Sequence, residues 1–74
     1  MNEQIIEFSG ANIPVIEAAK IMKKDQQFVR QGMIKGILPI GVAYVKEGSS
    51  QYDFYISPKL FYEYTGYLYE KPVE

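Results

Sequence analysis

The chain contains no cysteine, no histidine and no tryptophan among its 74 residues. Without cysteine, disulfide bonds and thiolate metal sites are excluded, and such a sequence fits a reducing compartment. Without histidine, the chain lacks the usual zinc ligand and the usual general base. No glycine-rich phosphate loop is present either, because Gly36 and Gly41 stand alone. We therefore predict that the protein is not an enzyme and holds no metal and no cofactor.

Long apolar segments are also absent. No run approaches the ~20 residues that a membrane span requires. Residues 1–4 are not basic, unlike the start of a secretory signal. We therefore expect a cytoplasmic location and no membrane partner. The length favours a single domain over residues 1–74, with a small hydrophobic core.

The net charge is only −1, but the charges are unevenly distributed. Residues 20–46 carry six basic side chains against the single carboxylate of Asp25, which gives this segment a net charge of +5, and the remaining residues sum to −6. This asymmetry predicts one basic and one acidic face. A basic face suits a nucleic acid, although lysine-rich helix ends also occur in proteins that bind none.

The stretch from Asp25 to Pro39 predicts a helix with a defined start and end. Asp25 can accept the unpaired amide protons of the first turn. Gly36 can adopt the left-handed conformation that closes a helix, and Pro39 prevents its continuation. At ~100° per residue, Val29 and Met33 fall on one side of this helix and polar residues on the other.

The polar side is suited to a DNA major groove, because Gln pairs with adenine and Arg with guanine through two hydrogen bonds each. The predicted base-contacting residues are Gln26, Gln27, Arg30, Gln31, Ile34 and Lys35. Lys23, Lys24 and Lys46 are predicted to contact phosphates. A solvated helix face without a ligand is the alternative interpretation.

An earlier helix is expected to begin near Pro14. Val15, Ala18, Ala19 and Met22 follow the spacing of a buried stripe. Only residues 23–25 separate the two helical patterns, and so short a connection is typical of a helix-turn-helix.

The run Glu17-Ala18-Ala19, the cap Asp25, the pair Val29-Arg30 and the ending Gly36-Ile37-Leu38-Pro39 resemble the excisionase-like and MerR-like helix-turn-helix family. These are small winged DNA-binding domains of phages, integrative elements and bacterial regulators. The resemblance covers residues 13–46. Lys24 and Gly32 depart from it, since the family commonly has apolar residues at these positions. We expect Phe28 to fill the space beside Gly32.

After Pro39 the pattern changes to a period of two. Residues 41–56 predict a β-hairpin with its turn at 47–50, and residues 57–66 predict a third helix with Ser57 as its cap. Leu60, Phe61 and Tyr64 are expected in the core. Residues 1–12 favour a short strand, an extended arm or a frayed tail, and residues 67–74 a strand or a packed tail.

Nine of the eleven aromatic residues lie between Tyr44 and Tyr69. Aromatic side chains fill a small core efficiently, which is the interpretation we favour. Stacking on single-stranded bases and a protein interface are the alternatives.

The fold that we predict is an α+β winged helix-turn-helix: helix-turn-helix 13–39, hairpin wing 41–56 and third helix 57–66. The resemblance implies sequence-specific binding of double-stranded DNA, as an excisionase-type recombination accessory or a small transcriptional regulator of a phage or mobile element. An integrase or a second copy of the chain are the further partners considered. The alternative is a protein-interaction module that keeps the fold without binding DNA.

Overall fold

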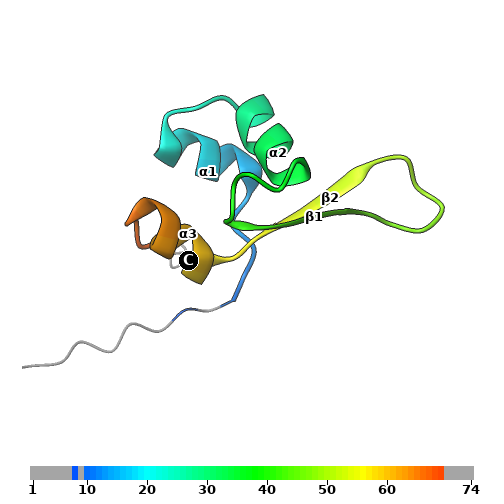
Figure 1. The fold of residues 1–74 in the computed structure, drawn as a ribbon. Helices are drawn as coiled ribbons and strands as arrows, with labels where there is room; N and C mark the ends of the chain where they lie inside the picture. Colours follow the sequence, from blue (N-terminus) through cyan, green and yellow to red (C-terminus); the bar gives the residue numbers. More distant parts are fainter. Residues whose placement is uncertain (1–7, 9, 70–74) are drawn as a thin grey trace, which may run out of the picture.

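The computed structural model describes residue 8 and residues 10–69, which form three helices and one two-stranded antiparallel sheet. The elements are α1 (Val15–Met22), α2 (Gln26–Ile34), β1 (Gly41–Val45), β2 (Tyr52–Ile56) and α3 (Pro58–Thr65). Figure 1 shows the hairpin projecting away from the three helices. The α+β class is confirmed, and the arrangement is compatible with a winged-helix layout. Of the segment suggested as a strand or arm, residues 1–7 and 9 lie outside the described residues.

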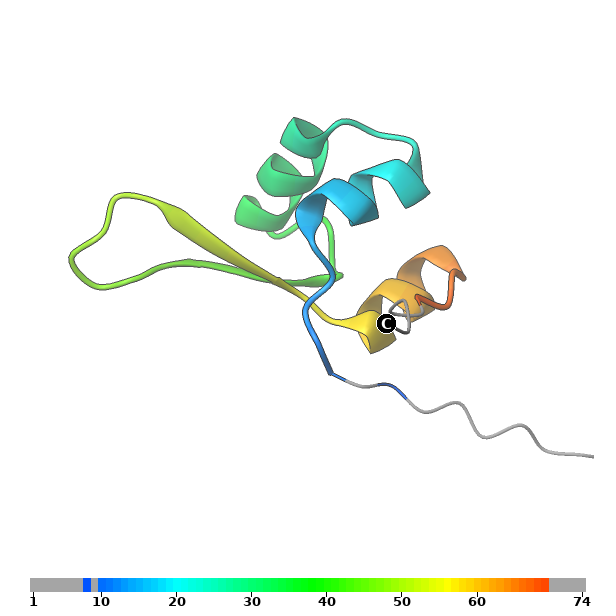
Figure 2. The ribbon, with the colours of Figure 1, turned by 180° about the vertical axis from the view of Figure 1, so that it is seen from behind.

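α1 and α2 pack against each other through small and apolar side chains. Ala18 and Ala19 of α1 are buried in one core cluster with Val29 and Met33 of α2, as predicted. Two alanines allow the helix backbones to approach closely. Because the connection is so short, the helices cross steeply, and one side of α2 stays uncovered by α1 (Figure 2).

The turn between these helices is closed by backbone hydrogen bonds. Lys23 ends α1 in the left-handed conformation, with φ of 60°. The amide of Lys24 donates to the carbonyl of Ala19 at 3.0 Å. Asp25 then starts α2, and its Oδ1 accepts the amide proton of Phe28 at 2.7 Å, which confirms the predicted N-cap.

The end of α2 folds back onto the helix. Gly36 has φ of +72°, as its predicted place after the helix requires. The amides of Ile37 and Leu38 both donate to the carbonyl of Gly32, at 3.0 and 3.1 Å. Leu38, which is 4% exposed, thereby fills the space beside Gly32, whereas Phe28 is 44% exposed. The prediction that Phe28 fills this space is wrong, because Leu38 of the returning loop occupies it.

The predicted hairpin is confirmed, with Gly41 opposite Ile56 and Val45 opposite Tyr52. The segment before α1 joins the end of β2, which it crosses in Figure 2. Ile13 donates its amide proton to the carbonyl of Ile56 at 3.1 Å, and Ile56 donates its own to Asn12 Oδ1 at 2.8 Å. These bonds anchor the base of the hairpin to the start of the helical pair.

α3 begins as predicted, with Ser57 accepting the amide proton of Leu60 at 3.3 Å and Pro58 at the first helical position. Phe61 is fully buried, but Leu60 and Tyr64 are 41% and 52% exposed. The expectation that all three lie in the core is therefore right for Phe61 and wrong for the other two, because this short helix buries a narrow strip.

The core is assembled from every part of the described chain. Its nine buried hydrophobic residues are Ile13, Ala18, Ala19, Val29, Met33, Leu38, Ile40, Ile56 and Phe61. Phe61 is the one aromatic side chain that is buried among the described residues. The favoured interpretation of the aromatic residues as core is therefore right for Phe61 and in part for Phe54 and Tyr69, which are half-buried against the core. It is wrong for the exposed ones, which are Tyr44, Tyr52, Tyr64 and Tyr67.

Of residues 67–74, for which a strand or a packed tail was predicted, residues 67–69 form no strand and pack as a tail, and residues 70–74 lie outside the described residues. The hydroxyl of Tyr69 donates a 2.8 Å hydrogen bond to Glu17 Oε1 on α1. In the part of the chain that the structure describes, no helix has both the length and the apolar character to cross a membrane.

Candidate nucleic-acid interface

The first turns of α2 carry three of the six predicted base-contacting residues. Gln27 is exposed, and Gln26 and Arg30 are half-buried. Arg30 Nη2 donates a 2.8 Å hydrogen bond to Gln26 Oε1. Residues four apart are neighbours on a helix surface, so this bond holds the guanidinium group along the helix. Arginine has five N–H donors, and the bond to Gln26 occupies one of them.

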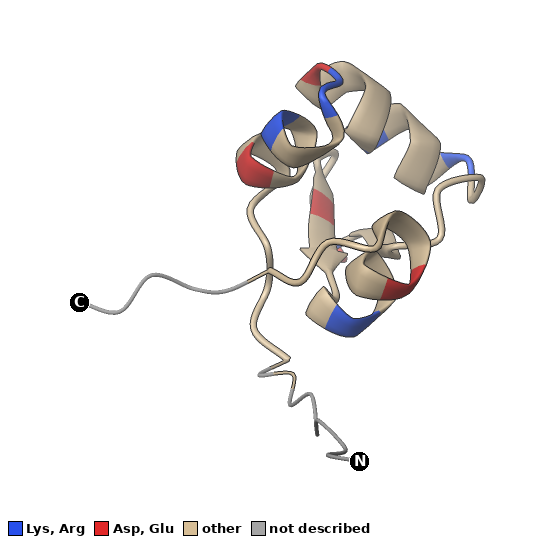
Figure 3. Ribbon diagram, turned by 90° about the vertical axis from the view of Figure 1, so that its left-hand side faces the viewer, with Lys and Arg blue, Asp and Glu red and all other residues tan. Residues whose placement is uncertain are grey.

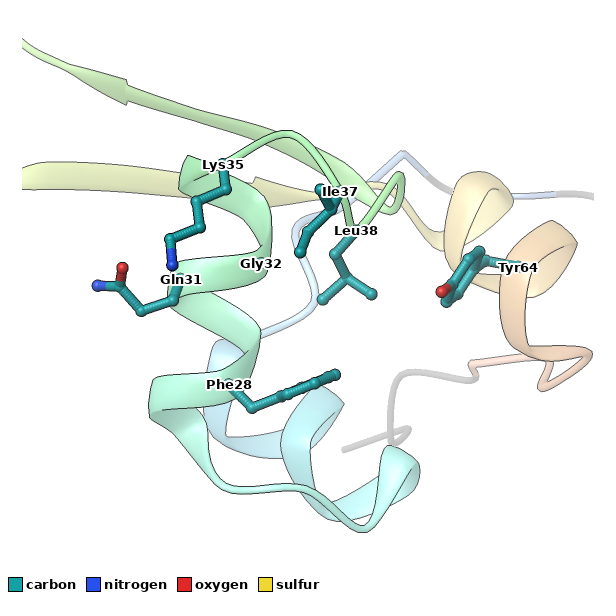
Figure 4. Close-up of a pocket in the computed structure, with 7 residues that line it drawn as sticks. All are labelled: Phe28, Gln31, Gly32, Lys35, Ile37, Leu38 and Tyr64. Atoms are coloured by element: carbon teal, nitrogen blue, oxygen red, sulfur yellow. The ribbon is translucent and has the colours of Figure 1, made fainter.

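The other three predicted base-contacting residues, Gln31, Ile34 and Lys35, lie in the second half of α2 and at its end. Ile34 is half-buried, Gln31 is half-buried and Lys35 is exposed. In Figure 4 the side chains of Gln31 and Lys35 lie side by side, on the side of α2 toward which the hairpin strands extend. The two residues also line a hollow beside α2. Gln31 and Lys35 thus belong both to the side of α2 that faces the hairpin and to the wall of the hollow.

Lys23 and Lys24 lie exposed in the turn before α2, where a phosphate group could approach them. The ammonium group of Lys24 lies 5.2 Å from the ring centroid of Phe28. A cation over an aromatic face is attracted to it, by roughly 0.5–1 kcal/mol at an exposed site. The contact keeps Lys24 beside the first turn of α2.

Lys46 lies at the end of β1 and is partly neutralised. Its Nζ is 3.7 Å from Asp53 Oδ2, and the Tyr44 hydroxyl donates to the same oxygen at 3.0 Å. Exposed ion pairs contribute little to stability, so a phosphate could replace Asp53 as the partner of Lys46. The structure does not bring Lys46 together with the other predicted phosphate-binding lysines.

Basic residues are concentrated in the helical pair. Residues 15–35 carry five basic and two acidic side chains, whereas α3 carries one of each sign. Figure 3 shows the basic positions at the connection between α1 and α2, within α2 and just beyond its end. The resulting field favours an anionic partner at α2.

The hairpin presents apolar and aromatic side chains to solvent. Val42, Tyr44, Val45 and Tyr52 are between 44% and 55% exposed. The rings of Tyr52 and Phe54 are stacked, with their centroids 6.2 Å apart. The predicted site included Lys46 alone from this hairpin, and the exposed tyrosines were missed. Alternation could not have marked them, because Tyr52 shares a face with its partner Val45, whereas Tyr44 lies on the other face of the hairpin.

The hollow beside α2 was not predicted. It encloses about 330 Å³, and its walls come from α2, from the loop after it and from α3 (Figure 4). The lining residues are Phe28, Gln31, Gly32, Lys35, Ile37, Leu38 and Tyr64. Gly32 adds no side chain of its own to the hollow, and Leu38 packs on its backbone. A glycine inside a helical pattern was the available signal.

Among the described residues, no three side chains of the metal-ligating acidic, histidine or cysteine types come together. The arrangement instead offers hydrogen-bond donors, positive charge and apolar surface, which is the chemistry of binding.

No family model matches the sequence, and no curated protein and no solved structure matches it. The geometry of α2 and its surroundings is therefore the basis for a functional proposal.

Proposed function

We propose that this chain is a winged helix-turn-helix protein that binds double-stranded DNA sequence-specifically, with α2 in the major groove. The observation that carries the proposal is the placement of α2. Val29 and Met33 anchor one side of the helix in the core, while Gln26, Gln27 and Arg30 present donors and acceptors at its N-terminal end. In helix-turn-helix proteins, this end of the second helix contacts the base edges.

The side chains in this part of α2 can form hydrogen bonds to the edges of DNA bases. Gln27 is free to form two hydrogen bonds to an adenine edge, and the guanidinium group of Arg30 can form two to guanine. The hydrogen bond that Arg30 donates to Gln26 Oε1 limits the rotamers of Arg30 before DNA binds. An ordered side chain loses less entropy on binding, so this pair favours recognition of one base pair over general attraction.

The lysines supply contacts that are independent of sequence. Lys23 and Lys24 flank the start of α2, and Lys46 extends the set to the hairpin. Phosphate contacts of this kind fix the position of a protein on the duplex without reading its sequence. The hairpin extends on the same side of α2 as Gln31 and Lys35 (Figure 4), which is where a wing reaches the neighbouring backbone.

The proposed setting is the cytoplasm of a bacterial cell that carries a phage or a mobile element. As an excisionase-type accessory, the protein would act on DNA beside an integrase. As a small transcriptional regulator, it would act on a promoter. Both roles use the same surface of α2, and the resemblance of residues 13–46 to the excisionase-like and MerR-like family supports them equally.

A protein-interaction module is the second candidate function. It is favoured by one specific observation, the exposed apolar residues Phe28, Ile37 and Tyr64 around the hollow. On this hypothesis the protein partner would bind at the hollow, next to the part of α2 that the first hypothesis gives to DNA.

The experiment that separates the two is selection of duplexes from a random pool, followed by titration of the selected duplex at several salt concentrations. A DNA-binding protein will enrich one motif, and log K will fall linearly with log salt as counterions are released. Failure to enrich any motif, together with no binding at low salt, would contradict the proposal and favour the interaction module.

A further inference from the structure

A second hollow lies next to the one beside α2. It encloses about 270 Å³ and is lined by Pro39, Leu60, Glu63 and Tyr64. Tyr64 lines both hollows, so they adjoin and form one groove across α2, the loop after it and α3. We call this surface the α2–α3 groove.

The α2–α3 groove is bordered by large apolar side chains in water. Ile37 is 72% exposed, Tyr64 is 52% exposed and Leu60 is 41% exposed. Exposed apolar side chains that gather around a groove with charged residues at its rim are typical of interaction sites.

The charges of the groove lie at opposite ends. Lys35 lines the first hollow and Glu63 the second, with Tyr64 between the two hollows. Within the described part of the chain, neither Lys35 nor Glu63 has an ion-pair partner. A surface with a cation at one end, apolar residues in the middle and an anion at the other end is complementary to itself when turned by 180°.

We propose that the α2–α3 groove is the contact between two copies of this chain. Around a two-fold axis near Tyr64, Lys35 of each copy faces Glu63 of the other, and the exposed Ile37 of each copy is covered by the other. An interface between identical surfaces requires this reciprocity, in which one residue meets a second and the second meets the first.

This dimer leaves the predicted base-contacting side chains in the N-terminal half of α2 uncovered, although Phe28 of that half lines the groove. Gln26, Gln27 and Arg30 do not line the groove, whereas Gln31 and Lys35 do. The inference thus assigns Lys35 to the protein contact. It does not depend on the proposed function, and its test uses no DNA, so the two can fail separately.

The test is sedimentation equilibrium of the full chain from about 10 µM to about 1 mM, the range suited to a small and weak interface. A monomer–dimer equilibrium is expected. Ile37→Asp places a charge in the apolar centre and should raise the dissociation constant at least about ten-fold. Val42→Asp is the matched control, because Val42 is 55% exposed on the hairpin and lies outside the groove. It should leave the dissociation constant unchanged.

Charge exchange tests the orientation of the two copies. Lys35→Glu and Glu63→Lys should each weaken self-association, because each variant places like charges opposite one another. An equimolar mixture of the two variants should associate as the unaltered chain does, since both contacts then pair opposite charges. Circular dichroism of each variant verifies that the fold persists.

Three results would overturn the proposal. The chain could stay monomeric throughout, the dimer could resist both Ile37→Asp and the charge reversals, or the mixture could fail to restore association. A monomer whose Ile37 methyl resonances respond instead to an acidic amphipathic peptide would assign the groove to a different protein, and would equally overturn it.

Discussion

Leu38 lies directly against the backbone of α2 at Gly32. A β-carbon added at Gly32 would stand 3.0 Å from Leu38 Cβ and 3.2 Å from its Cδ2. Glycine inside a helix costs ~1 kcal/mol relative to alanine. The close approach of Leu38 explains why a glycine at this position is compatible with a stable fold, since a β-carbon there would require Leu38 to shift by a few tenths of an ångström.

Gly32→Ala should therefore destabilise the protein, although alanine favours helices. Crowding in a packed interior typically costs ~1–3 kcal/mol, which exceeds the ~1 kcal/mol gained from helix propensity. Chemical denaturation should show a net loss of about 1 kcal/mol in the free energy of unfolding.

The Leu38→Ala background provides the control for that change. Without its γ and δ carbons, residue 38 can withdraw from the helix, so Gly32→Ala should cost at least about 0.5 kcal/mol less there. Strict additivity of the two substitutions would mean that Leu38 does not limit the side chain at position 32.

Ala19→Glu should abolish cooperative unfolding. Ala19 is 3% exposed and belongs to the core cluster that contains Val29 and Met33, so a carboxylate there would be buried without a partner. An uncompensated buried charge costs ~3–5 kcal/mol, a large part of the stability of a small domain. Thermal melting followed by circular dichroism measures the effect.

Ile16→Glu is the matched control for Ala19→Glu, because it adds the same charge to α1 at a residue that is 48% exposed. It should melt cooperatively. If both variants lost the cooperative transition, the cause would be a further negative charge anywhere in α1, and the result would not report on the burial of Ala19.

The alkaline stability of the protein should depend on Tyr69. Its hydrogen bond to the Glu17 carboxylate, together with burial, raises the pKa of Tyr69 above its ordinary value of 10.0. The bond therefore stabilises the fold fully below pH 10, and this contribution is lost as pH rises through the folded-state pKa. Tyr69→Phe should weaken the decline in unfolding free energy above pH 10.

Tyr67→Phe is the comparison for Tyr69→Phe, since no side-chain hydrogen bond joins the Tyr67 hydroxyl to another described residue. It should keep the alkaline decline of the unaltered chain. Identical pH profiles for the two variants would show that the bond to Glu17 does not persist in solution.

The helix ends could be predicted from the sequence because they depend on local chemistry. Asp25 and Ser57 cap their helices through bonds to residues three positions away, and Gly36 takes the left-handed conformation that its place requires. The hairpin follows equally from alternation and a turn signal. These features depend on neighbours within a few residues, so one sequence contains the information.

Long-range packing could not be predicted in this way. The packing of Leu38 on Gly32 depends on how the loop after Gly36 returns to the helix. The exposure of Tyr64 depends on which strip of α3 meets the core, and the α2–α3 groove needs segments that are distant in the chain. Periodicity identifies an apolar face without specifying whether another element covers it.

Lys23, Lys24 and Lys46 should contribute to DNA affinity without affecting base preference. Each Lys→Gln change should weaken binding about equally on all duplexes and reduce the magnitude of the salt slope by ~1 for each phosphate that is no longer bound. Lys59→Gln is the matched control, because it removes the same charge from α3. A lysine whose replacement alters base preference at an unchanged slope would belong with the base-contacting residues.

Arg30→Ala should leave the fold nearly intact. Arg30 is the one arginine in the chain, and its hydrogen bond runs to Gln26 on the same helix, not to the core. A side-chain bond between residues four apart on a helix contributes ~0.2–0.5 kcal/mol. The melting temperature of Arg30→Ala should therefore stay close to that of the unaltered chain.

On DNA the same substitution should have a large effect. Removal of a two-point hydrogen bond to guanine should cost ~1–3 kcal/mol on the selected duplex and relax the preference at one base pair. Arg30→Lys should restore little of this, because an ammonium group cannot copy the planar pair of donors. Gln26→Ala should weaken the same preference in part, since it releases the guanidinium group without removing it.

These variants distinguish a base contact from a phosphate contact at Arg30. If the guanidinium group bound a phosphate, Arg30→Lys would retain most of the affinity, and the selected motif would not change. If Arg30 touched no DNA, affinity and motif would both persist in Arg30→Ala, and the assignment of α2 as the recognition helix would be wrong. Measuring the selected motif and the salt slope together for the three variants decides among these outcomes, because only a base contact changes the motif.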